Sequence, residues 1–340
     1  MTELLLAGGG HTHALLLRRW AHRPRQRPAA RITLVSRSAL TPYSGRLPSC
    51  LAGRCGLAEA SLPVAALCAA AGVAFVPAEI EGLDLRGRQL RLAPPAAPLA
   101  YDLLSLDVGA DVPLPAPALA AGAPLLPVRP AEAVLRALGR LSPGSAVAVF
   151  GGGASAVEVA LALVVRGCRV SLHPRGPGLW QVFTPALVAA GIAVVEGPAA
   201  VGTALALACT GARLPAWLAT SGLPLAPGGR LAVEPDLTLP GWPQVFAVGD
   251  GALVRGAERP AAGVWAVKAA PRLHDNLRRR LQGRPLRPWR PPQRAVQLLG
   301  DGRGRAWLLR ASGRRPLGPS RLLGLWKQVL DGAFLARLQP

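Results

Sequence analysis

Two glycine-rich turns have the residue pattern of phosphate-binding sites. The first turn, 8–10, is Gly-Gly-Gly between an apolar strand pattern at 4–7 and a helix pattern that begins near His11. The second turn, 151–153, is Gly-Gly-Gly after the strand pattern 147–150. Glycine lets the backbone turn sharply and approach a pyrophosphate, and the N-terminus of the following helix attracts its negative charge. One such turn is weak evidence, whereas two in one chain predict two dinucleotide sites.

The residues after the next strand patterns bear on how the ribose ends would bind. A dinucleotide fold usually has an acidic residue there, which holds the ribose hydroxyls. Ser36 and Arg37 stand at this point in the first half, where the strand pattern 31–36 ends. In the second half, Arg175 follows the strand pattern 168–173 and could meet a 2′-phosphate. Because the usual carboxylates are missing, the sequence does not decide whether the chain would use NADH or NADPH.

Two histidines alternate around the first turn. His13 takes the position of the third glycine of the usual G-x-G-x-x-G pattern, and His11 lies two residues before it. They could cap or pack against the turn, or they could bind a metal ion. Packing is the favoured interpretation because no third metal ligand lies nearby in the sequence. We expect no metal site.

Length and composition restrict the class of protein. The chain has 340 residues, of which 51% are hydrophobic, so a large core is expected and disorder is excluded. No apolar run reaches the length of a membrane span, and the first strand pattern begins by about Glu3, which leaves no room for a signal peptide. Five cysteines are few for a disulfide framework and fit a reducing, cytoplasmic location.

The formal net charge of +21 would ordinarily favour a polyanionic partner. Lys268 and Lys327 are the two lysines, and every other position of the Lys and Arg total is arginine. Arginine, alanine, glycine and proline are enriched together, which favours a compositional origin of the charge. The sequence shows no helix-turn-helix, zinc-finger or RNP pattern. We therefore expect no specific nucleic-acid partner.

The order of the predicted elements favours an α/β fold with two Rossmann-like dinucleotide-binding domains. Strand patterns recur at corresponding positions of the two halves, and a Pro/Ala-rich connector at 113–127 marks a domain crossing. We predict a discontinuous first domain at 1–112 and 229–285, a second domain at 113–228, and a C-terminal extension at 286–340.

Further elements are predicted within this frame. Helices are expected at 61–71 and 263–280, a hairpin at 79–92, a strand at 101–110, and two pairing strands at 296–299 and 305–309. An amphipathic helix is expected within 319–338. Its apolar face would consist of Leu322, Leu325, Trp326, Val329, Leu330 and Phe334.

The motifs together resemble a known superfamily. GGGHTHALLLRRW, TPYSGRLPSCLAG, YDLLSLDVGA and VFAVGD occur in one order, similar to the pyridine nucleotide-disulfide oxidoreductases. The most similar branch resembles type II NADH dehydrogenases and is often fused to selenophosphate synthase. The resemblance implies the glutathione reductase-like FAD/NAD(P) fold, with FAD as cofactor and NAD(P)H as co-substrate. It also implies that electrons pass to a quinone or another small acceptor, and it makes selenophosphate synthase a candidate partner.

The resemblance also implies roles for particular residues. FAD would be held by Gly8, Gly9, Gly10, His11, Ser36, Arg37, Gly109, Gly249 and Asp250. NAD(P)H would be held by Gly151, Gly153, Ala156, Arg175 and Gly211. Glu158 would lie near the nicotinamide, or it is a helix-surface carboxylate in the first helical turn. Lys268 would stabilise the negative charge of reduced flavin, or it is a solvated lysine on a helix face.

Cys50 and Cys55 have the C-x-x-x-x-C spacing of the redox pair in disulfide reductases of the superfamily. The surrounding residues differ from the reductase pattern, and side chains five residues apart on a regular helix point about 140° apart. We therefore favour the interpretation that the spacing of the two cysteines is a coincidence. The alternatives to an NAD(P)H oxidoreductase are a thiol–disulfide reductase that uses this pair and a non-catalytic flavoprotein that serves selenium metabolism. Peripheral contact with the inner face of the membrane also stays open.

Overall fold

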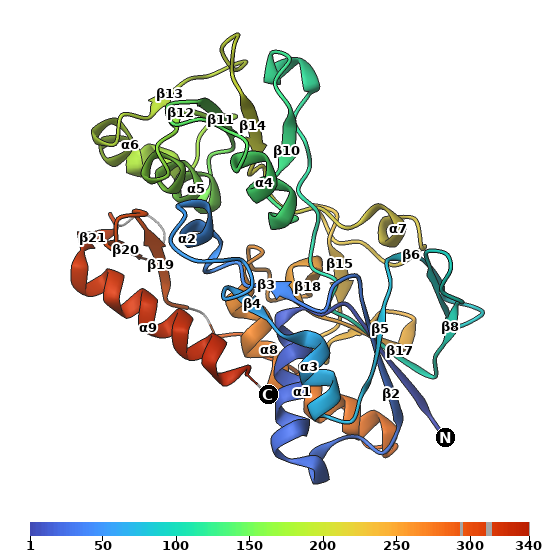
Figure 1. The fold of residues 1–340 in the computed structure, drawn as a ribbon. Helices are drawn as coiled ribbons and strands as arrows, with labels where there is room; N and C mark the ends of the chain where they lie inside the picture. The colour runs from blue at the N-terminus through green and yellow to red at the C-terminus, as the bar shows by residue number, and fades with distance from the viewer. Residues whose placement is uncertain (293–294, 311–314, 340) are drawn as a thin grey trace.

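The computed structural model describes residues 1–292, 295–310 and 315–339. The protein has the predicted α/β fold, with two mainly parallel sheets, each covered by helices. In Figure 1 the second sheet and its helices lie above the first, and the C-terminal segment, in red, runs along one side of both. Residues 293–294, 311–314 and 340 of the predicted extension lie outside the described residues.

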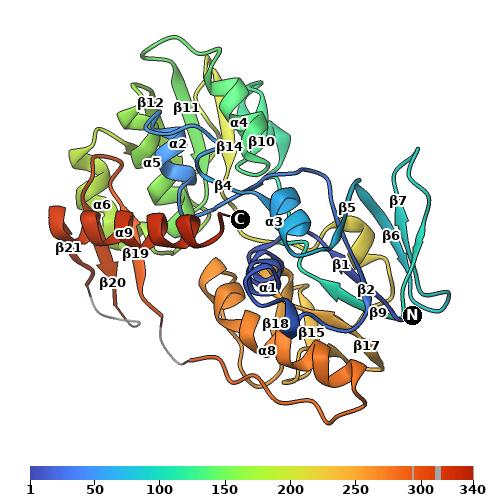
Figure 2. The same ribbon diagram turned by 60° about the horizontal axis from the view of Figure 1, so that its bottom comes forward.

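The first sheet has the strand order β16-β17-β9-β1-β2-β5. All neighbouring pairs are parallel except β16 with β17. Helices α1 and α8 pack against each other, and α3 packs on the other side of α1, as Figure 2 shows. The bounds are β1 (Glu3–Ala7), β2 (Arg31–Ser36), β5 (Ala74–Pro77), β9 (Leu103–Leu106), β16 (Thr238–Leu239), β17 (Trp242–Ala247), α1 (His11–His22), α3 (Val64–Ala70) and α8 (Gly263–Leu281).

The second sheet has the strand order β10-β14-β11-β12-β13, and all its pairs are parallel. Helix α5 is apolar around almost its whole circumference because one side faces this sheet while the other faces α2 and β19. The bounds are β10 (Leu125–Pro127), β11 (Ala146–Phe150), β12 (Arg169–His173), β13 (Ala193–Val194), β14 (Leu205–Ala208), α2 (Leu47–Leu51), α4 (Ala131–Leu138), α5 (Ala154–Val165) and α6 (Trp180–Ala189).

Smaller elements complete the two lobes. The predicted hairpin is confirmed and has a third strand, β8, paired with β7. The remaining bounds are β3 (Thr41–Pro42), β4 (Ser61–Leu62), β6 (Ile80–Asp84), β7 (Gln89–Leu92), β8 (Leu99–Ala100), β15 (Leu231–Val233), β18 (Ala252–Val254), α7 (Ala216–Ala219), and the 3₁₀ turns η1 (Pro24–Gln26), η2 (Pro117–Ala120) and η3 (Gly249–Gly251).

The prediction of a helix at 61–71 is wrong at its beginning. Ser61–Leu62 forms β4, which pairs with β3, and the helix begins only at Val64. Pro63 accounts for the difference, because a proline disfavours helical backbone in the residue before it and has no N–H to donate. The strand predicted at 101–110 is also shorter, since β9 ends at Leu106 and the chain turns at Asp107.

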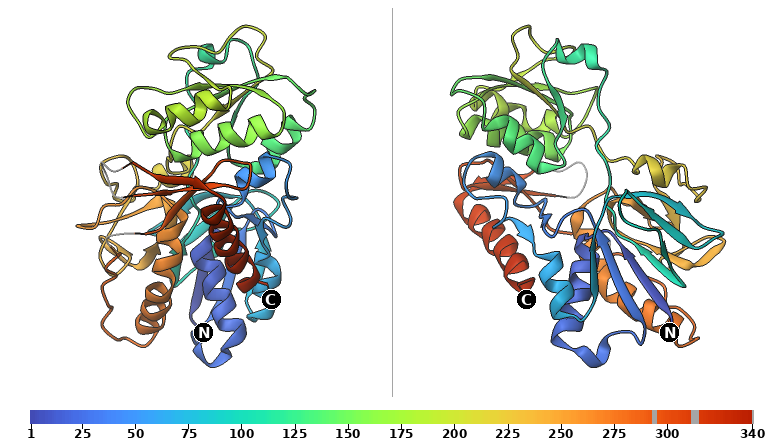
Figure 3. Two further views of the ribbon diagram at one scale, coloured as in Figure 1. Left: turned by 90° about the vertical axis from the view of Figure 1, so that its left-hand side faces the viewer. Right: turned by 45° about the vertical axis from the view of Figure 1, so that its right-hand side comes forward.

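The C-terminal extension contains a small antiparallel sheet and a long helix. The predicted pairing of two strands is confirmed by β19 and β20, and β21 pairs with β20. Helix α9 packs against β19, β20 and β21 and lies at the periphery of the molecule (Figure 3). The bounds are β19 (Gln297–Gly300), β20 (Ala306–Leu309), β21 (Leu317–Ser320) and α9 (Arg321–Arg337).

The predicted amphipathic helix is present as α9, and most of its apolar face lies in solvent. Leu325 and Val329 are 57% and 58% exposed, whereas Asp331 is 9% exposed. The inward side carries Gly324, where a Cβ would overlap the backbone of Gly304. This close approach and the buried polar contacts described below fix which side of the helix packs, and they leave the leucine-rich side in solvent.

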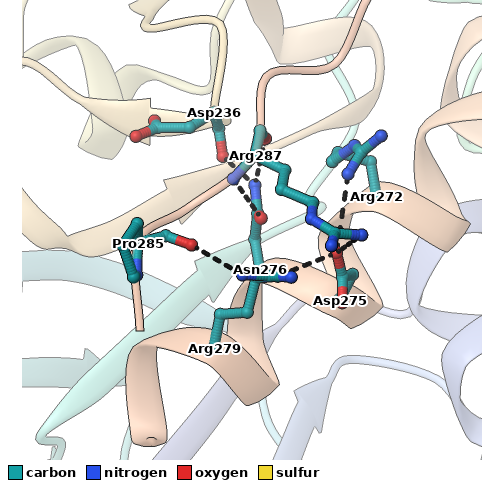
Figure 4. Close-up of polar contacts among 7 residues, drawn as sticks. All are labelled: Asp236, Arg272, Asp275, Asn276, Arg279, Pro285 and Arg287. Atoms are coloured by element: carbon teal, nitrogen blue, oxygen red, sulfur yellow. Dashed lines mark hydrogen bonds and ion pairs between the residues drawn. The ribbon is translucent and has the colours of Figure 1, made fainter. Parts of the chain in front are cut away.

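A buried asparagine anchors the chain that leaves α8 for the extension (Figure 4). Asn276 Nδ2 donates to Asp236 O and Arg287 O, both at 2.8 Å, and its Oδ1 accepts from Arg287 N at 2.9 Å. The neighbouring Asp275 carboxylate is half-exposed and lies 3.1–3.7 Å from three arginine side chains. The asparagine makes the structural contact, since exposed ion pairs contribute little.

Among the described residues, no helix is long and apolar enough to cross a membrane.

We predict that Asn276→Ala lowers the free energy of unfolding by about 1–3 kcal/mol, because it removes the buried amide that hydrogen-bonds the backbone of Asp236 and Arg287. Asp275→Asn, next to it, is the matched control and should cost less than about 1 kcal/mol. Denaturant unfolding of both variants measures the difference. Equal losses would contradict the assignment of the anchor to Asn276.

Candidate functional site

A cavity of about 720 Å³ lies at the carboxyl ends of β1, β2 and β9. This is the edge of a parallel sheet at which ligands bind in doubly wound folds, and the volume suits a small-molecule ligand. All the residues that the sequence assigned to FAD line this one cavity, namely Gly8, Gly9, Gly10, His11, Ser36, Arg37, Gly109, Gly249 and Asp250. The structure therefore brings the first predicted set together.

The first glycine turn is held against a buried carboxylate. Asp107 Oδ2 accepts hydrogen bonds from the backbone N–H groups of Thr12 at 2.9 Å and His13 at 3.0 Å. A Cβ at Gly10 would overlap the Asp107 carboxylate, and one at Gly8, whose φ is +96°, would overlap the Asp107 backbone. Glycine is thus required at both positions by close approach, not only by flexibility.

Asp107 lines the cavity and was not among the site residues predicted from the sequence. It is 3% exposed and caps the N-terminus of α1 with a side chain from the end of β9. A carboxylate favours the positive end of a helix, but it also places negative charge where a phosphate would approach. The sequence does mark Asp107, as the one acidic residue in the apolar run Leu-Leu-Ser-Leu-Asp-Val-Gly. That run was predicted to be a single strand.

Two buried polar atoms at the cavity have no protein partner. His11 Nε2 and Asp250 Oδ1 make no hydrogen bond within the described residues, although both residues line the cavity. Asp250 Oδ2 lies 3.4 Å from Arg129 Nη1. Burial lowers the pKa of His11, so its ring is neutral near pH 7. Buried polar atoms without partners indicate a ligand or water that completes them.

The two histidines of the first turn differ in environment. His13 is fully buried, with Nδ1 2.7 Å from Gly8 O and Nε2 2.8 Å from Ser105 Oγ, which confirms the packing interpretation for this residue. His11 lies against the rings of Tyr43 and Phe334, with centroids 5.5 and 5.8 Å away. Within the part of the chain that the structure describes, no group of three His, Cys, Asp or Glu side chains could hold a metal ion.

The second glycine turn is separate from the large cavity. Gly151 has φ +138°, and a Cβ there would overlap Cys209 O, whereas a Cβ at Gly153 would have no atom within 4 Å. Ala156 is fully buried beneath the turn, while Gly153, Arg175 and Gly211 are exposed. This leaves the N-terminus of α5 open to solvent on the side where a second dinucleotide is predicted.

The end of β12 carries a histidine in place of the usual acid. His173 Nε2 lies 2.8 Å from Ser171 Oγ and its Nδ1 lies 3.0 Å from Gly197 O. The indole of Trp180 packs onto the second turn, 2.8 Å from where a Cβ of Gly152 would stand. His173 and Trp180 both lie beside the second turn, and neither was among the predicted site residues.

Glu158 lies in a buried polar network outside the large cavity. Its Oε1 accepts from Gly300 N at 2.8 Å and lies 3.7 Å from Lys327 Nζ. Lys327 Nζ also donates to Asp331 Oδ2 at 3.1 Å, and Tyr43 Oη donates to Asp331 Oδ1 at 2.9 Å. Burial raises the pKa of Glu158, and the Lys327 charge opposes this rise. The glutamate is 16% exposed and is not a solvated surface carboxylate.

Lys268, which was predicted to stabilise the reduced flavin, lies elsewhere. Its side chain is on the exposed side of α8 and is not among the residues that line the large cavity. The role of Lys268 near the flavin stays a prediction, and the lining of the cavity does not support it. Of the two lysines, Lys327 is the one that the fold buries, with 17% of its side chain exposed.

Cys50 and Cys55 are closer together than helical spacing allows. Helix α2 ends at Leu51, and the chain turns back through Gly53, whose φ is +74°, so the two Sγ atoms are 3.2 Å apart. The expectation of widely separated side chains is therefore wrong, because the helix ends between the cysteines. Burial raises the pKa of Cys50 to about 12, which keeps this sulfur a protonated thiol and a poor nucleophile.

Comparisons with solved structures show the same fold. Sulfide:quinone oxidoreductase from Aquifex aeolicus has a TM-score of 0.77 at 16% identity, over 99% of this chain and 91% of that chain. Water-forming NADH oxidase from Lactobacillus brevis, bound to NADH, has a TM-score of 0.70 at 18% identity, over 91% and 75%. The ferredoxin reductase for the CYP199A2 system from Rhodopseudomonas palustris has a TM-score of 0.66 at 19% identity, over 92% and 89%. No protein-family model and no curated protein matches the sequence.

We predict that Gly10→Ala lowers the free energy of unfolding by about 1–3 kcal/mol, because the new methyl group displaces the Asp107 carboxylate from the α1 N–H groups. Gly153→Ala, at the equivalent place of the second turn, is the control. It has φ −89° and open space around the Cβ, so its stability should change by less than about 0.5 kcal/mol. Thermal unfolding of both variants tests this, and a tolerated Gly10→Ala would contradict the close approach.

Lys327→Met should destabilise the protein by about 3 kcal/mol or more, because it leaves Glu158 and Asp331 buried without their shared cation. Lys268→Met removes the other lysine from an exposed position and should stay within about 0.5 kcal/mol of wild type. Denaturant unfolding compares the two. A neutral Lys327→Met would show that the network does not hold the extension.

Proposed function

We propose that the protein is an FAD-dependent oxidoreductase that takes hydride from NAD(P)H and passes electrons to a small acceptor. The observation that carries the proposal is the large cavity on the first glycine turn, with the unpartnered atoms His11 Nε2 and Asp250 Oδ1 at its wall. FAD, when bound, supplies the hydride and electron transfer chemistry. The chain would supply the close approach of the backbone and the orientation of the bound group.

The wall of the cavity offers groups suited to different parts of FAD. The turn 8–10 and the start of α1 would hold the pyrophosphate, and Ser36 and Arg37 would meet the adenosine end. Asp250 would accept a hydrogen bond from a flavin-side hydroxyl through Oδ1. Gly109 and Gly249 have φ of +73° and +77° and allow the backbone to pass close to the ligand.

For the second dinucleotide we propose the second glycine turn. Gly151, Gly153 and Ala156 would hold NAD(P)H through the open N-terminus of α5, with Arg175 and Gly211 at the exposed rim. We propose the corresponding division into domains, with FAD at 1–112 and 229–285, NAD(P)H at 113–228 and the extension at 286–340. The sequence resemblance alone carries two further proposals, a role of Glu158 near the nicotinamide and a role of Lys268 near the flavin.

Several finer proposals follow from the sequence resemblance and the shared fold. The protein would belong to the pyridine nucleotide-disulfide oxidoreductases. It would have a type II NADH dehydrogenase-like activity, with a quinone as the electron acceptor. The name of one structural neighbour includes a quinone as its substrate. We also propose a cytoplasmic location with peripheral contact at the inner face of the membrane, and selenophosphate synthase as a partner.

A second candidate activity is thiol–disulfide reduction through Cys50 and Cys55. The 3.2 Å separation of their Sγ atoms favours it, because the two sulfurs need little movement to form a bond. The raised pKa of Cys50 opposes it, since the thiolate is the reactive species.

Anaerobic titration with NADH and NADPH in parallel tests the main proposal. The purified protein should be yellow, and one of the two nucleotides should bleach its flavin absorbance stoichiometrically. A screen of quinones and other small oxidants should then restore the absorbance. A protein that binds no flavin, or whose flavin neither nucleotide reduces, would overturn the proposed activity, and the latter result would favour a non-catalytic flavoprotein.

Asp250→Ala is expected to weaken FAD binding by about 1–3 kcal/mol, because it removes the acceptor that faces the cavity. Asp250→Asn keeps a side-chain oxygen of the same shape and should lose less. Flavin retained after gel filtration at low protein concentration gives the comparison. Full retention in Asp250→Ala would reject the assignment of this residue.

Cys50→Ser and Cys55→Ser should keep NAD(P)H oxidation within about tenfold of wild type, a barrier change below 1.4 kcal/mol. The reason is that hydride transfer to a flavin needs neither thiol. Steady-state turnover of each variant with the best acceptor is the measurement. A larger loss in both variants would instead support the disulfide mechanism.

A further inference from the structure

A second, small cavity lies beside the turn η3. Its volume is about 30 Å³, which gives room for about two water molecules or one small ion. Gly249 lines both this small cavity and the large one, so the two share the turn that carries Asp250. The small cavity is thus a separate space next to the proposed flavin site.

The polar side chains of the small cavity are all hydrogen-bond donors. They belong to Arg230, Arg259, Trp265 and Trp289, and the rest of the described lining consists of Leu, Val, Ala and Gly. A guanidinium and an indole donate through N–H groups and have no acceptor. The described lining contains no carboxylate, hydroxyl or amide side chain. A lining of this composition suits a ligand that only accepts hydrogen bonds.

Two of these donors lack a protein partner. Trp265 Nε1 and Arg259 Nε are buried atoms that make no hydrogen bond within the described residues. The Arg259 guanidinium lies over the Trp265 ring, with Cζ 5.5 Å from the ring centroid, which holds the two residues together at the cavity. A buried donor without a partner costs free energy, so this pair indicates a bound group that completes both.

Arg230 adds a positive charge whose own donors are already used. Its three guanidinium nitrogens donate to the backbone carbonyl oxygens of Asp250 at 2.9 Å, Arg259 at 2.6 Å and Ala252. These acceptors are neutral and leave the charge of Arg230 in place. The Asp250 carboxylate lines the large cavity instead, where Arg129 Nη1 lies 3.4 Å from it. The small cavity therefore has a positive electrostatic potential.

The chain that leaves α8 completes the lining of the small cavity. Trp289 lines it, and its backbone N–H donates to Pro235 O at 2.6 Å. The anchor at Asn276 holds the same segment through Arg287. Since both ends of this short stretch are hydrogen-bonded to the first lobe, the cavity is formed before a ligand enters it.

We infer that the small cavity binds one small monovalent anion, of the size of chloride, bromide or nitrate, through Trp265 Nε1 and Arg259 Nε. The two guanidinium charges offset the loss of the anion's hydration. A water molecule fits less well, because its own hydrogens would find no acceptor among the side chains of the lining. This site goes beyond the proposed function and does not rest on flavin or nucleotide binding.

Bromide is the probe, because its anomalous scattering identifies it in a crystal. Crystals of the protein as purified, soaked in sodium bromide, should show an anomalous peak within hydrogen-bond distance of Trp265 Nε1 and Arg259 Nε. Water at this position would overturn the inference. Bromide on exposed arginines alone would also overturn it, since this result would mean an adventitious ion only.

Variants test the same site in solution. Trp265→Phe and Arg259→Gln each remove one of the two donors, and the matched controls are Trp326→Phe and Arg310→Gln, at exposed positions in the extension. The melting temperature is measured against bromide concentration, with gluconate replacing bromide so that the ionic strength stays constant. Bromide should raise the melting temperature of wild type and of both controls with the same half-saturating concentration. Each test variant should need about tenfold more bromide or should not respond.

The outcomes separate this site from general binding of anions to a basic protein. A wild-type melting temperature that does not depend on bromide would overturn the inference. So would an unchanged half-saturating concentration in both test variants, because the two donors would then not hold the ion. If Trp265→Phe fails to fold, Arg259→Gln and the diffraction experiment still decide. Flavin content and its reduction by NAD(P)H are recorded separately, so failure here leaves the proposed activity standing.

Discussion

The hydrogen bonds from Thr12 and His13 to the Asp107 carboxylate fix the first glycine turn, and the rest of the candidate site depends on them. They join the end of β9 to the beginning of α1, and they bring the backbone so close that neither Gly8 nor Gly10 could carry a Cβ. The other side of the same turn is left to face the cavity. A carboxylate at the positive end of a helix thus positions the turn while it occupies two of the N–H groups that a phosphate could use.

A second polar cluster holds the extension against both lobes. Tyr43 comes from the first lobe, Glu158 from the helix of the second, and Lys327 and Asp331 from α9. Buried charges that share a cation fix orientation more than they add stability. Here the orientation has a visible consequence, because the leucine-rich side of α9 faces outward while Phe334 reaches the ring of His11. The extension therefore borders the cavity through Phe334 and exposes an apolar side to solvent.

The sequence predicted the parts of the fold that local patterns determine. Apolar strand runs and glycine turns identified both parallel sheets, and the residues assigned to FAD line a single cavity. Contacts between distant segments were not predictable in this way. Asp107 was assigned to a strand, Glu158 meets Lys327 across 169 positions, and the cysteines approach each other because α2 ends between them. For α9 the periodic pattern identified the helix correctly, but the burial of Lys327 and Asp331 decided which side packs.

The central claim is that FAD binds on the first glycine turn. An experimental structure of the purified protein with its native flavin tests it most directly. We predict pyrophosphate density over Gly10 and the start of α1, with a flavin-side hydroxyl within hydrogen-bond distance of Asp250 Oδ1. Density for the flavin on the second turn at Gly151–Gly153, or a cavity filled by Asp107 and water with no flavin in the protein, would contradict the account.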